Sequence, residues 1–347
     1  MTAHGSVAPM AADGIDHRDQ VARFPDHVHI DARWVDGGIG RFAANVVPLV
    51  IGGGRELHGR MNRSRPPGQA QLAARFAPLA PGGGLLFSPG FAPPFVWERR
   101  TIVTVHDLHY LDPTIANSRQ HEYFRRVMVP QLRRCRLVLT VSEASAGQIR
   151  AVLGDRAPDV VVVGNGVDAG LLDAADAGGD GPPQLLFVGG DKVNKNLPMA
   201  LRAFDAARST TGAEMVVVGP VADDIEHTAP VGVEFVGSVS EQRLAELYGR
   251  STALLMPSIS EGFGLPALEA MVAGTPVIFG NRDALPDVVG EHGWPVDPFD
   301  AESIAAGISE SVHHPIEIDG ATRRDLVEGH QWCHVAQRIV AAVKEVQ

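Results

Sequence analysis

Short runs of consecutive apolar residues alternate along the chain with segments in which apolar positions recur every three or four residues. The first pattern is typical of strands in a parallel sheet covered on both faces, and the second of amphipathic helices. Strands are predicted at 27–35, 84–89, 101–107, 136–142, 159–166, 184–190, 213–220, 233–238, 253–258 and 275–280, and a short run follows to 293–298. Helices are predicted at 42–50, 69–77, 118–135, 143–154, 196–209, 240–251, from Pro266 onward, 301–312 and 320–345. This alternation favours an α/β fold.

The composition changes over residues 167–183, which are mostly small or acidic and are interrupted by Gly and Pro. Such a segment is typical of a linker between domains. A second α/β series follows it, so we predict two Rossmann-like lobes with a cleft between them. The predicted boundaries are a mobile tail (1–27), a first lobe (28–166), the linker (167–183), a second lobe (184–325) and a C-terminal helix (326–347) that packs back toward the first lobe.

The bulk composition narrows the class of protein. A formal net charge of −11 over 347 residues argues against nucleic acid as the main partner. Cys135 and Cys333 lie far apart and lack the spacing of a metal site, which favours a reducing, cytoplasmic location. No apolar run has the length of a membrane span, and the first residues lack the features of a signal peptide.

The segment SEGFGLPALEA, residues 260–270, combines an anion-binding pattern with two carboxylates. Pro266 suits the first turn of a helix, which places Gly262, Phe263, Gly264 and Leu265 at a helix N-terminus with free N–H groups. Such a terminus binds phosphate or an electron-rich oxygen. Glu261 and Glu269 can each accept hydrogen bonds from vicinal hydroxyls. Alternatively, Glu269 complements the helix dipole and Glu261 is an exposed loop residue.

Cations for a phosphate are predicted in the segment GGDKVNKNL, residues 189–197, between a strand and a helix. Lys192 and Lys195 lie close to the start of that helix and suit a phosphate, although two solvated loop lysines are the alternative. In the first lobe, Gly37 and Gly38 of the segment DGGIGRF place N–H groups at a second helix N-terminus, with Arg41 close by. A plain tight turn is the alternative there.

Taken together, these residues resemble the retaining glycosyltransferases of family 4, which have the GT-B fold. The most specific match is PSISEGFGLPALEAMVAGTPVI, which corresponds to the E-x7-E region of that family. The other matches follow in the family's order: IDARW…GGIGRF, TVHDLHYLDP, LVLTVSEAS, VVVGNGVD, LLFVGGDKVNKNL and VEFVGSVSEQRLAELY. The resemblance covers most of residues 28–345 and implies a GT-B fold with a donor site in the cleft.

The resemblance also implies roles for individual residues. Glu261 matches the glutamate that contacts the donor sugar, and Glu269 the one that holds the nucleotide ribose. Lys195 matches the lysine on the donor diphosphate, and Gly38 a glycine that faces the phosphates. His106 matches a histidine beside the donor sugar, with a strand-end histidine that caps a neighbouring loop as the alternative. Ser238 and Val239 match a turn whose backbone contacts the base.

The chain also departs from the family pattern. Many members carry an arginine where this chain has Gly190 and Asp191, so Lys192 is the expected substitute. Residues 51–84 form a shortened part of the first lobe, which leaves acceptor recognition open. The segment HDLH, residues 106–109, has no third ligand or Asp-x-Asp motif beside it. A metal-independent site without cofactors is therefore expected, in which helix dipoles and lysines stabilise the leaving group.

The activity implied by the resemblance is transfer of a hexose from a nucleoside diphosphate sugar to an acceptor hydroxyl, with retention of configuration. GDP-mannose is the favoured donor, and a glycan, glycolipid or polyprenyl-linked saccharide is the expected acceptor. Two rival functions remain open. One is a sugar-nucleotide epimerase of the same fold, and the other is a catalytically silent partner subunit, which the shortened first lobe would suit.

A basic amphipathic helix is predicted at 118–136. Its apolar positions would face the core, and its arginines suit contact with an anionic membrane surface at the inner face. The alternative is a solvated arginine face over a core stripe. The arginines are Arg119, Arg125, Arg126, Arg133, Arg134 and Arg136.

Overall fold

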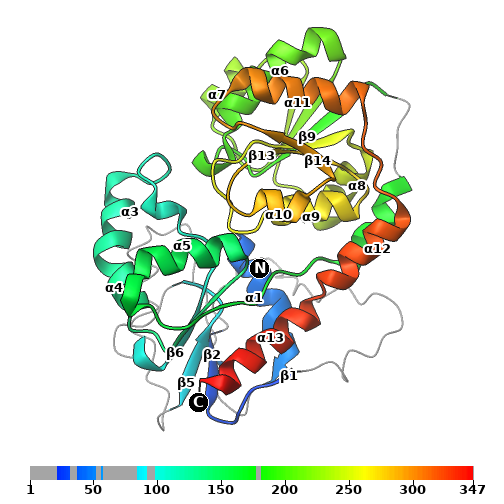
Figure 1. The fold of residues 1–347 in the computed structure, drawn as a ribbon. Helices are drawn as coiled ribbons and strands as arrows, with labels where there is room; N and C mark the ends of the chain where they lie inside the picture. The colour runs from blue at the N-terminus through cyan, green and yellow to red at the C-terminus, as the bar shows by residue number, and fades with distance from the viewer. Residues whose placement is uncertain are drawn as a thin grey trace, which may run out of the picture.

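A computed structural model describes residues 22–31, 37–51, 56–57, 84–91, 98–176 and 181–346. The described strands form two six-stranded sheets, one in each of two lobes, and a further two-stranded pair. Helices pack on both faces of the six-stranded sheets, and the two lobes stack one above the other (Figure 1). The fold is therefore the predicted α/β architecture with two Rossmann-like lobes.

The sheet of the first lobe is parallel, in the order β4-β2-β5-β6-β7-β8. Its central strands are almost wholly apolar and completely buried, because helices cover both faces. Among these helices are α1 (Gly37–Val46) and α5 (Glu143–Leu153). The strands are β2 (Val28–Asp31), β4 (Glu56–Leu57), β5 (Leu85–Ser88), β6 (Thr101–Val105), β7 (Leu137–Thr140) and β8 (Val160–Val162).

The sheet of the second lobe is also parallel, in the order β11-β10-β9-β12-β13-β14. The chain runs outward from β9 in one direction and then returns to add β12 on the other side, which is the strand order of a dinucleotide-binding Rossmann sheet. Helices α6 (Leu197–Thr211) and α11 (Ala301–His313) pack together on one face. The strands are β9 (Gln184–Val188), β10 (Glu214–Val218), β11 (Val233–Gly237), β12 (Ala253–Met256), β13 (Val277–Gly280) and β14 (Gly293–Val296).

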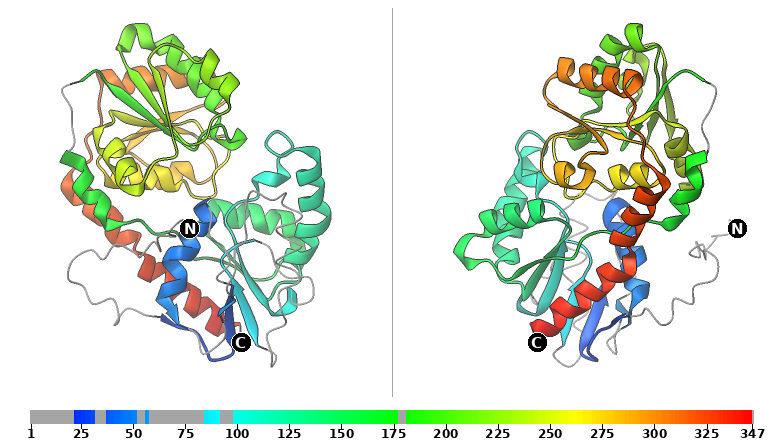
Figure 2. Two further views of the ribbon diagram at one scale, coloured as in Figure 1. Left: turned by 180° about the vertical axis from the view of Figure 1, so that it is seen from behind. Right: turned by 45° about the vertical axis from the view of Figure 1, so that its right-hand side comes forward.

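The C-terminal segment returns to the first lobe. The prediction of a single helix at 320–345 is wrong. The segment forms two helices, α12 (Gly320–Gly329) and α13 (Trp332–Glu345), with a break at His330. Helix α13 packs against α1 and against β1 (Ala22–Arg23), and the views of Figure 2 show it lying along the first lobe. The chain also crosses between lobes near Val167, whose N–H donates to the carbonyl oxygen of His330 at 2.9 Å. The two crossings are therefore hydrogen-bonded to each other.

Several predicted boundaries differ from the structure. The tail predicted at 1–27 is wrong for its last residues, because β1 pairs with β3 (Val50–Ile51) and Phe24 is buried in the core. The helix predicted at 42–50 begins earlier, because α1 starts at Gly37. The predicted linker contains a 3-10 helix, η7 (Ala169–Asp176), which packs against α8 (Glu241–Arg250). The helix predicted at 69–77 lies outside the described residues.

Short helices and a helical irregularity account for further differences from the sequence prediction. Helices α7 (Asp223–Thr228) and α10 (Leu285–Val289) are too short for a clear helical period. The basic helix predicted at 118–135 is divided into α3 (Ser118–Tyr123), a π-helical turn η5 (Phe124–Met128) and α4 (Val129–Leu132). Pro130 follows this turn and cannot donate a backbone hydrogen bond, which favours the irregular geometry there.

Candidate functional site

The carboxyl ends of β9 and β12 lie side by side at the centre of the second lobe, where the strand order reverses. Leu186 of β9 pairs with Leu254 of β12, and β10 lies on the other side of β9. Ligands of doubly wound sheets bind at such a point because the loops after the two strands diverge there. The loop after β9 carries Lys195 and the loop after β12 carries Glu261, so the fold brings these two predicted residues together.

Lys195 and Glu261 form a largely buried ion pair. The Nζ atom of Lys195 lies 2.7 Å from Oε1 of Glu261, and each side chain is 11% exposed. Lys195 is the last residue of η8 (Val193–Lys195), directly before α6. A charged pair with so little exposure is costly to maintain unless the geometry is good. The pair places one cation and one carboxylate at the position where a ligand of this fold binds.

Two asparagines hold the lysine loop against the loop that carries Glu261. The Nδ2 atom of Asn196 donates to the carbonyl oxygens of Pro257 at 3.1 Å and Pro298 at 2.6 Å. Asn194 donates from Nδ2 to the carbonyl of Ser260 at 3.2 Å. Asn196 is in the left-handed region, with φ 65°, which asparagine tolerates better than most residues. These asparagines were not predicted as site residues, although their positions on either side of Lys195 were a usable signal.

The turn after Glu261 requires its glycines. A Cβ atom on Gly262 would lie 2.0 Å from the carbonyl oxygen of His106, so only glycine allows this approach. Gly264 has φ 96° and precedes α9 (Leu265–Val272). Phe263 is buried, with its ring against that of His330 at a centroid distance of 5.9 Å. The predicted turn therefore forms the start of a helix and also contacts the first lobe.

Glu269 is buried within α9 and is held from both lobes. The hydroxyl of Tyr248, which is completely buried in α8, donates to Oε2 of Glu269 at 3.0 Å. Nη1 of Arg41, from α1 of the first lobe, donates to Oε1 of Glu269. Arg41 also lies 3.4 Å from the exposed carboxylate of Glu241. The ion pair of Arg41 and Glu269 thus joins residues 228 positions apart, one from each lobe.

The protonation of this cluster follows from its burial. Removal from water raises the pKa of Glu269, against the opposing effects of the Arg41 charge and the hydrogen bonds from Tyr248 and Arg41. The carboxylate of Glu269 in turn raises the pKa of Arg41, against the effect of burial, and keeps that guanidinium charged. Burial and the same carboxylate raise the pKa of Tyr248 well above its ordinary value. Tyr248 is therefore a fixed hydrogen-bond donor.

His106 lies at the end of β6, at the edge of the first lobe that faces the second. Its Nε2 atom is 3.1 Å from the carbonyl oxygen of Pro89, and its ring meets Phe42 edge-on at 4.9 Å. The contact with the Pro89 carbonyl is the one that a histidine capping a neighbouring loop would make. The His106 backbone lies against Gly262, so the histidine is also adjacent to the turn that carries Glu261.

The next residues form a carboxylate–imidazole pair, in which Nδ1 of His109 contacts Oδ1 of Asp107. Burial would raise the pKa of Asp107, but the hydrogen bond and charge of His109, with a smaller effect of His106, hold it below its ordinary value. Asp107 is therefore ionised, two residues after the end of β6. Among the described residues, no group of three or more His, Cys, Asp or Glu side chains has a metal-binding arrangement.

Helix α5 of the first lobe contacts the turn that carries Glu261. Ser142, which caps the helix, and Ser145, one turn later, donate from Oγ to the carbonyl of Gly262 at 2.6 and 3.0 Å. Ser145 Oγ also lies 3.1 Å from the carbonyl of His106. These serines have the ordinary appearance of a helix start in the sequence, which is why the sequence analysis did not single them out.

The same face of α5 reaches Glu261 through an aspartate. Gln148 donates from Nε2 to Oδ1 of Asp283 at 2.8 Å. The other oxygen of Asp283 accepts from the backbone N–H of Glu261 at 3.3 Å. Asp283 has φ 52°, an uncommon conformation for a residue other than glycine. The backbone of Glu261 is thus linked to the first lobe.

The other predicted residues lie around this centre. Lys192 is exposed and precedes η8. Ser238 and Val239 follow β11, two strands from β9, and lead into α8, which carries Glu241 and Tyr248. Gly37 and Gly38 are the first residues of α1, one turn before Arg41. Leu265 begins α9 and is half-buried.

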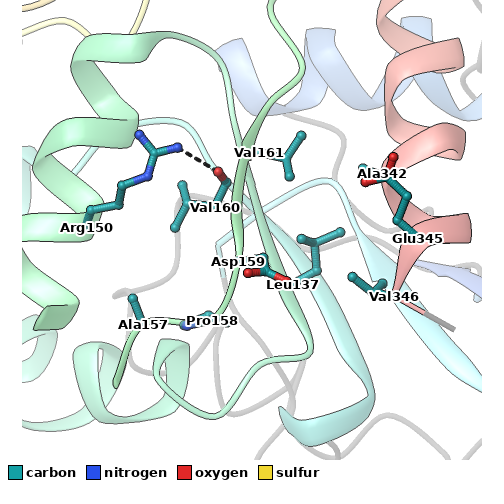
Figure 3. A pocket seen from close by; sticks show the side chains of 10 residues that line it. All are labelled: Leu137, Arg150, Ala157, Pro158, Asp159, Val160, Val161, Ala342, Glu345 and Val346. Atoms are coloured by element: carbon teal, nitrogen blue, oxygen red, sulfur yellow. Dashed lines mark hydrogen bonds between the residues drawn. The ribbon is translucent and has the colours of Figure 1, made fainter. Parts of the chain in front are cut away.

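A separate hollow of about 640 Å³ lies at the opposite end of the first lobe's sheet. Figure 3 shows it between β8 and the end of α13, with Arg150 donating to the carbonyl of Val160 at 2.8 Å. Leu137 and Val160, which begin β7 and β8, line it. The hollow is therefore at the amino ends of the strands and takes no part in the site described above.

Two family models match the chain, one in each lobe. The model for Glycosyltransferase Family 4 matches residues 84–171, and the model for Glycosyl transferases group 1 matches residues 182–314. The matches extend over the loops that carry His106, Lys195 and Glu261. The fold and these two domains define a glycosyltransferase of the GT-B class. Within that class, the chain carries a family 4 domain in its first lobe and a group 1 domain in its second.

Several relatives are mannosyltransferases. The chain is 27% identical over 280 residues to O-antigen chain mannosyltransferase B of Escherichia coli, which covers 74% of this chain and 73% of the relative. It is 30% identical over 229 residues to MMP alpha-(1->4)-mannosyltransferase of Mycolicibacterium hassiacum, which covers 60% of this chain and 54% of the relative. The match therefore spans about half the length of the second relative.

Solved structures with the same fold cover nearly the whole chain. Sucrose-phosphate synthase of Thermosynechococcus elongatus has a TM-score of 0.70 at 19% identity, over 93% of this chain and 99% of that one. HepE of Anabaena, whose structure contains UDP and glucose, has a TM-score of 0.68 at 16% identity, over 93% of this chain and 100% of that one. These similarities establish the GT-B fold of the chain.

Proposed function

We propose that the protein transfers a hexose, with mannose favoured, from a nucleoside diphosphate sugar to an acceptor hydroxyl, with retention of configuration. The observation that carries this proposal is the buried pair of Lys195 and Glu261 at the point where the strand order reverses. The cation there suits the diphosphate of a donor and the carboxylate suits the hydroxyls of its sugar. The mannosyltransferase relatives favour mannose and, with it, GDP-mannose.

The proposed donor lies along the cleft face of the second lobe. Its diphosphate contacts Lys195 and the N–H groups of residues 262–265, where the start of α9 adds the positive end of the helix dipole. Its sugar contacts Glu261 and lies beside His106, and its ribose contacts Glu269. The base lies at the turn of Ser238 and Val239. Each carboxylate faces hydroxyls, so neither is placed against the phosphates.

In the proposed reaction, the acceptor hydroxyl attacks on the same face of the sugar from which the diphosphate leaves. The departing phosphate oxygen takes the proton of the acceptor, so the protein supplies no carboxylate nucleophile. The transition state carries charge on the sugar and on the leaving diphosphate. Lys195 and the α9 N-terminus stabilise the second of these charges without a divalent metal. Contact between the lobes excludes water from the reacting atoms.

The proposed acceptor is a glycan, a glycolipid or a polyprenyl-linked saccharide. We further propose that the arginines of 118–136 contact an anionic membrane that carries such an acceptor. In support, Arg125 and Arg126 are exposed on one side of the helix, although both contact Glu122. In the part of the chain that the structure describes, no helix has the length and apolar character needed to cross a membrane. Binding to vesicles with and without anionic lipid tests this contact.

The test of the proposed function begins with thermal unfolding in the presence of nucleoside diphosphates and their sugars. A ligand present at 100 times its Kd stabilises a protein by about 2.7 kcal/mol, which gives a clear shift in Tm. The donor that stabilises the protein is then incubated, as labelled GDP-mannose or its equivalent, with lipid-linked acceptors. We expect a glycosylated product with the anomeric configuration of the donor.

The alternatives give different results in the same experiments. An epimerase would interconvert sugar-nucleotide isomers without any acceptor. A silent subunit would bind the donor and transfer nothing. Absence of stabilisation by any nucleoside diphosphate or its sugar would contradict the proposed function as a whole.

A further inference from the structure

Each of the two glutamates in the candidate site is paired with a cation. Glu261 holds Lys195 within the second lobe, and Glu269 holds Arg41 from the first lobe. The lysine loop itself supplies one buried cation, since Lys192 is exposed and Asp191 is acidic. A diphosphate carries at least two negative charges, so a second buried or half-buried cation would complement it.

Both oxygens of Glu269 are occupied. Tyr248 donates to Oε2 at 3.0 Å and Arg41 donates to Oε1. Tyr248 is completely buried between helices of its own lobe and cannot leave without disrupting the core. The Arg41 side chain is 33% exposed, is long and belongs to the other lobe. If ribose hydroxyls bind to Glu269, as the proposed function requires, Arg41 is the partner that they displace.

We propose that Arg41 is a donor-binding residue that exchanges partners when the donor binds. In the free protein it neutralises the buried carboxylate of Glu269, which would otherwise be left as an unpaired charge. When the donor binds, the ribose hydroxyls take its place on Glu269 and the guanidinium pairs with the diphosphate. The inference rests on the proposed function, because it assumes a ligand with a ribose and a diphosphate.

The surroundings of Arg41 favour this second partner. Arg41 lies one turn after Gly37 and Gly38, whose N–H groups are at the start of α1 and lack partners within the helix. The guanidinium and this helix start therefore lie together on the first lobe. A planar guanidinium can donate two parallel hydrogen bonds to one phosphate group, which suits it to a bound diphosphate better than an ammonium group.

The test compares a nucleoside with its diphosphate in wild type and in Arg41→Gln. The probes are GDP and guanosine, with UDP and uridine beside them, measured by calorimetry and by competition. We expect the preference for the diphosphate over the nucleoside to fall by about tenfold or more in Arg41→Gln, because only the diphosphate loses a partner. The affinity for the nucleoside itself should rise or stay constant, because Glu269 no longer has to release Arg41.

Two further variants support the comparison. Arg41→Lys keeps a positive charge beside Glu269, so it should preserve the fold if Arg41→Gln does not. It should lower the preference for the diphosphate over the nucleoside by about threefold, because an ammonium group lacks the paired donors of a guanidinium. Arg150→Gln removes an exposed arginine of the same lobe and should leave the preference unchanged. If Arg41→Gln changes both affinities by the same factor, Arg41 only holds the lobes together and the inference is wrong. If the wild-type protein binds neither GDP nor UDP, the proposed function is wrong, and the inference about Arg41 is wrong with it.

Discussion

The hydroxyl of Ser142 lies 2.6 Å from the carbonyl oxygen of Gly262, a residue 120 positions later in the chain. Ser145 donates to the same carbonyl, so the start of α5 in the first lobe holds the turn beside Glu261 in the second. Contact between the lobes and the position of that carboxylate are therefore linked. If Glu261 aligns the reacting sugar, as proposed, its alignment therefore depends on contact between the two lobes.

We expect Ser145→Ala, and more strongly the double variant with Ser142→Ala, to lower kcat. Each lost hydrogen bond is worth about 0.5–1.5 kcal/mol, and each 1.4 kcal/mol in the barrier is about tenfold in rate. The Kd of the bare nucleoside diphosphate should change little, because the two serines hold the turn beside Glu261 and that ligand has no sugar for Glu261 to align. Ser142 also caps α5, so Asp319→Ala, which removes the cap of α12, controls for lost stability. Equal losses in kcat and in nucleotide affinity would contradict the link.

Lys195→Ala should weaken the affinity for the nucleoside diphosphate by about 1.5–3 kcal/mol, because a phosphate loses a charge-assisted hydrogen bond. Calorimetry with the matching diphosphate measures the change. Lys192→Ala in the same loop is the control, since that side chain is exposed. If Lys192→Ala has the larger effect, Lys192 is the phosphate partner.

Glu261→Gln should mainly lower kcat, whereas Glu269→Gln should mainly lower the affinity for the nucleotide. If Glu261 aligns the reacting sugar, its variant should lose on the order of a hundredfold in kcat and keep its affinity for the bare diphosphate. If Glu269 holds the ribose, its variant should bind the sugar donor and the bare diphosphate more weakly by a similar factor. Circular dichroism checks the fold of both. The assignment is reversed if Glu261→Gln weakens the bare diphosphate as much as the donor.

Removal of divalent metal should leave activity intact. Because the proposed leaving group is stabilised by Lys195 and a helix N-terminus, enzyme treated with EDTA should retain its rate in metal-free buffer. A large loss that Mg²⁺ or Mn²⁺ restores would show that a metal shares this role.

The raised pKa of Glu269 predicts how stability depends on pH. Burial makes the folded protein bind this proton more tightly than the unfolded chain, whose glutamate has the ordinary value of 4.5. The contribution of Glu269 to the free energy of unfolding therefore falls as pH rises from 4.5 through the raised pKa. In the wild type this fall is at most about 1.4 kcal/mol per pH unit, and Glu269→Gln should lack it. Urea unfolding of wild type and variant from pH 4.5 upward measures the difference in their free energies of unfolding. The prediction is contradicted if wild type becomes more stable relative to the variant as pH rises.

The sequence predicted the parts of the site that lie within single stretches of chain. Gly262 to Leu265, Glu269 and Lys195 could be placed on a loop or a helix start because strand, glycine turn and proline follow one another directly. The pair of Arg41 and Glu269 could not be predicted, because it depends on how two separate lobes face each other. Tyr248 reads as an ordinary core position of an amphipathic helix, and only the fold turns its hydroxyl toward a carboxylate.

The same limit applies to the fold. Apolar runs identified the strands of both six-stranded sheets except β4 and β14, because burial on two faces leaves a strong signal. The two residues of β4 are too few to form such a run. The break between α12 and α13 was missed although Gly329 marks it, since the apolar period continues on either side. The π-helical turn at Phe124–Met128 has no period of its own and was read as continuous α-helix.

The hydrogen bond between Val167 and His330 joins the two points at which the chain passes between the lobes. The chain leaves the first lobe and re-enters it at neighbouring points, so residues 168–329 form one continuous insertion whose ends already meet. Replacing that insertion with a short peptide would leave a first lobe completed by α13. The second lobe could equally be exchanged for that of a related GT-B protein at these two points without altering the sequence of the first lobe, as for other domains whose termini lie close together.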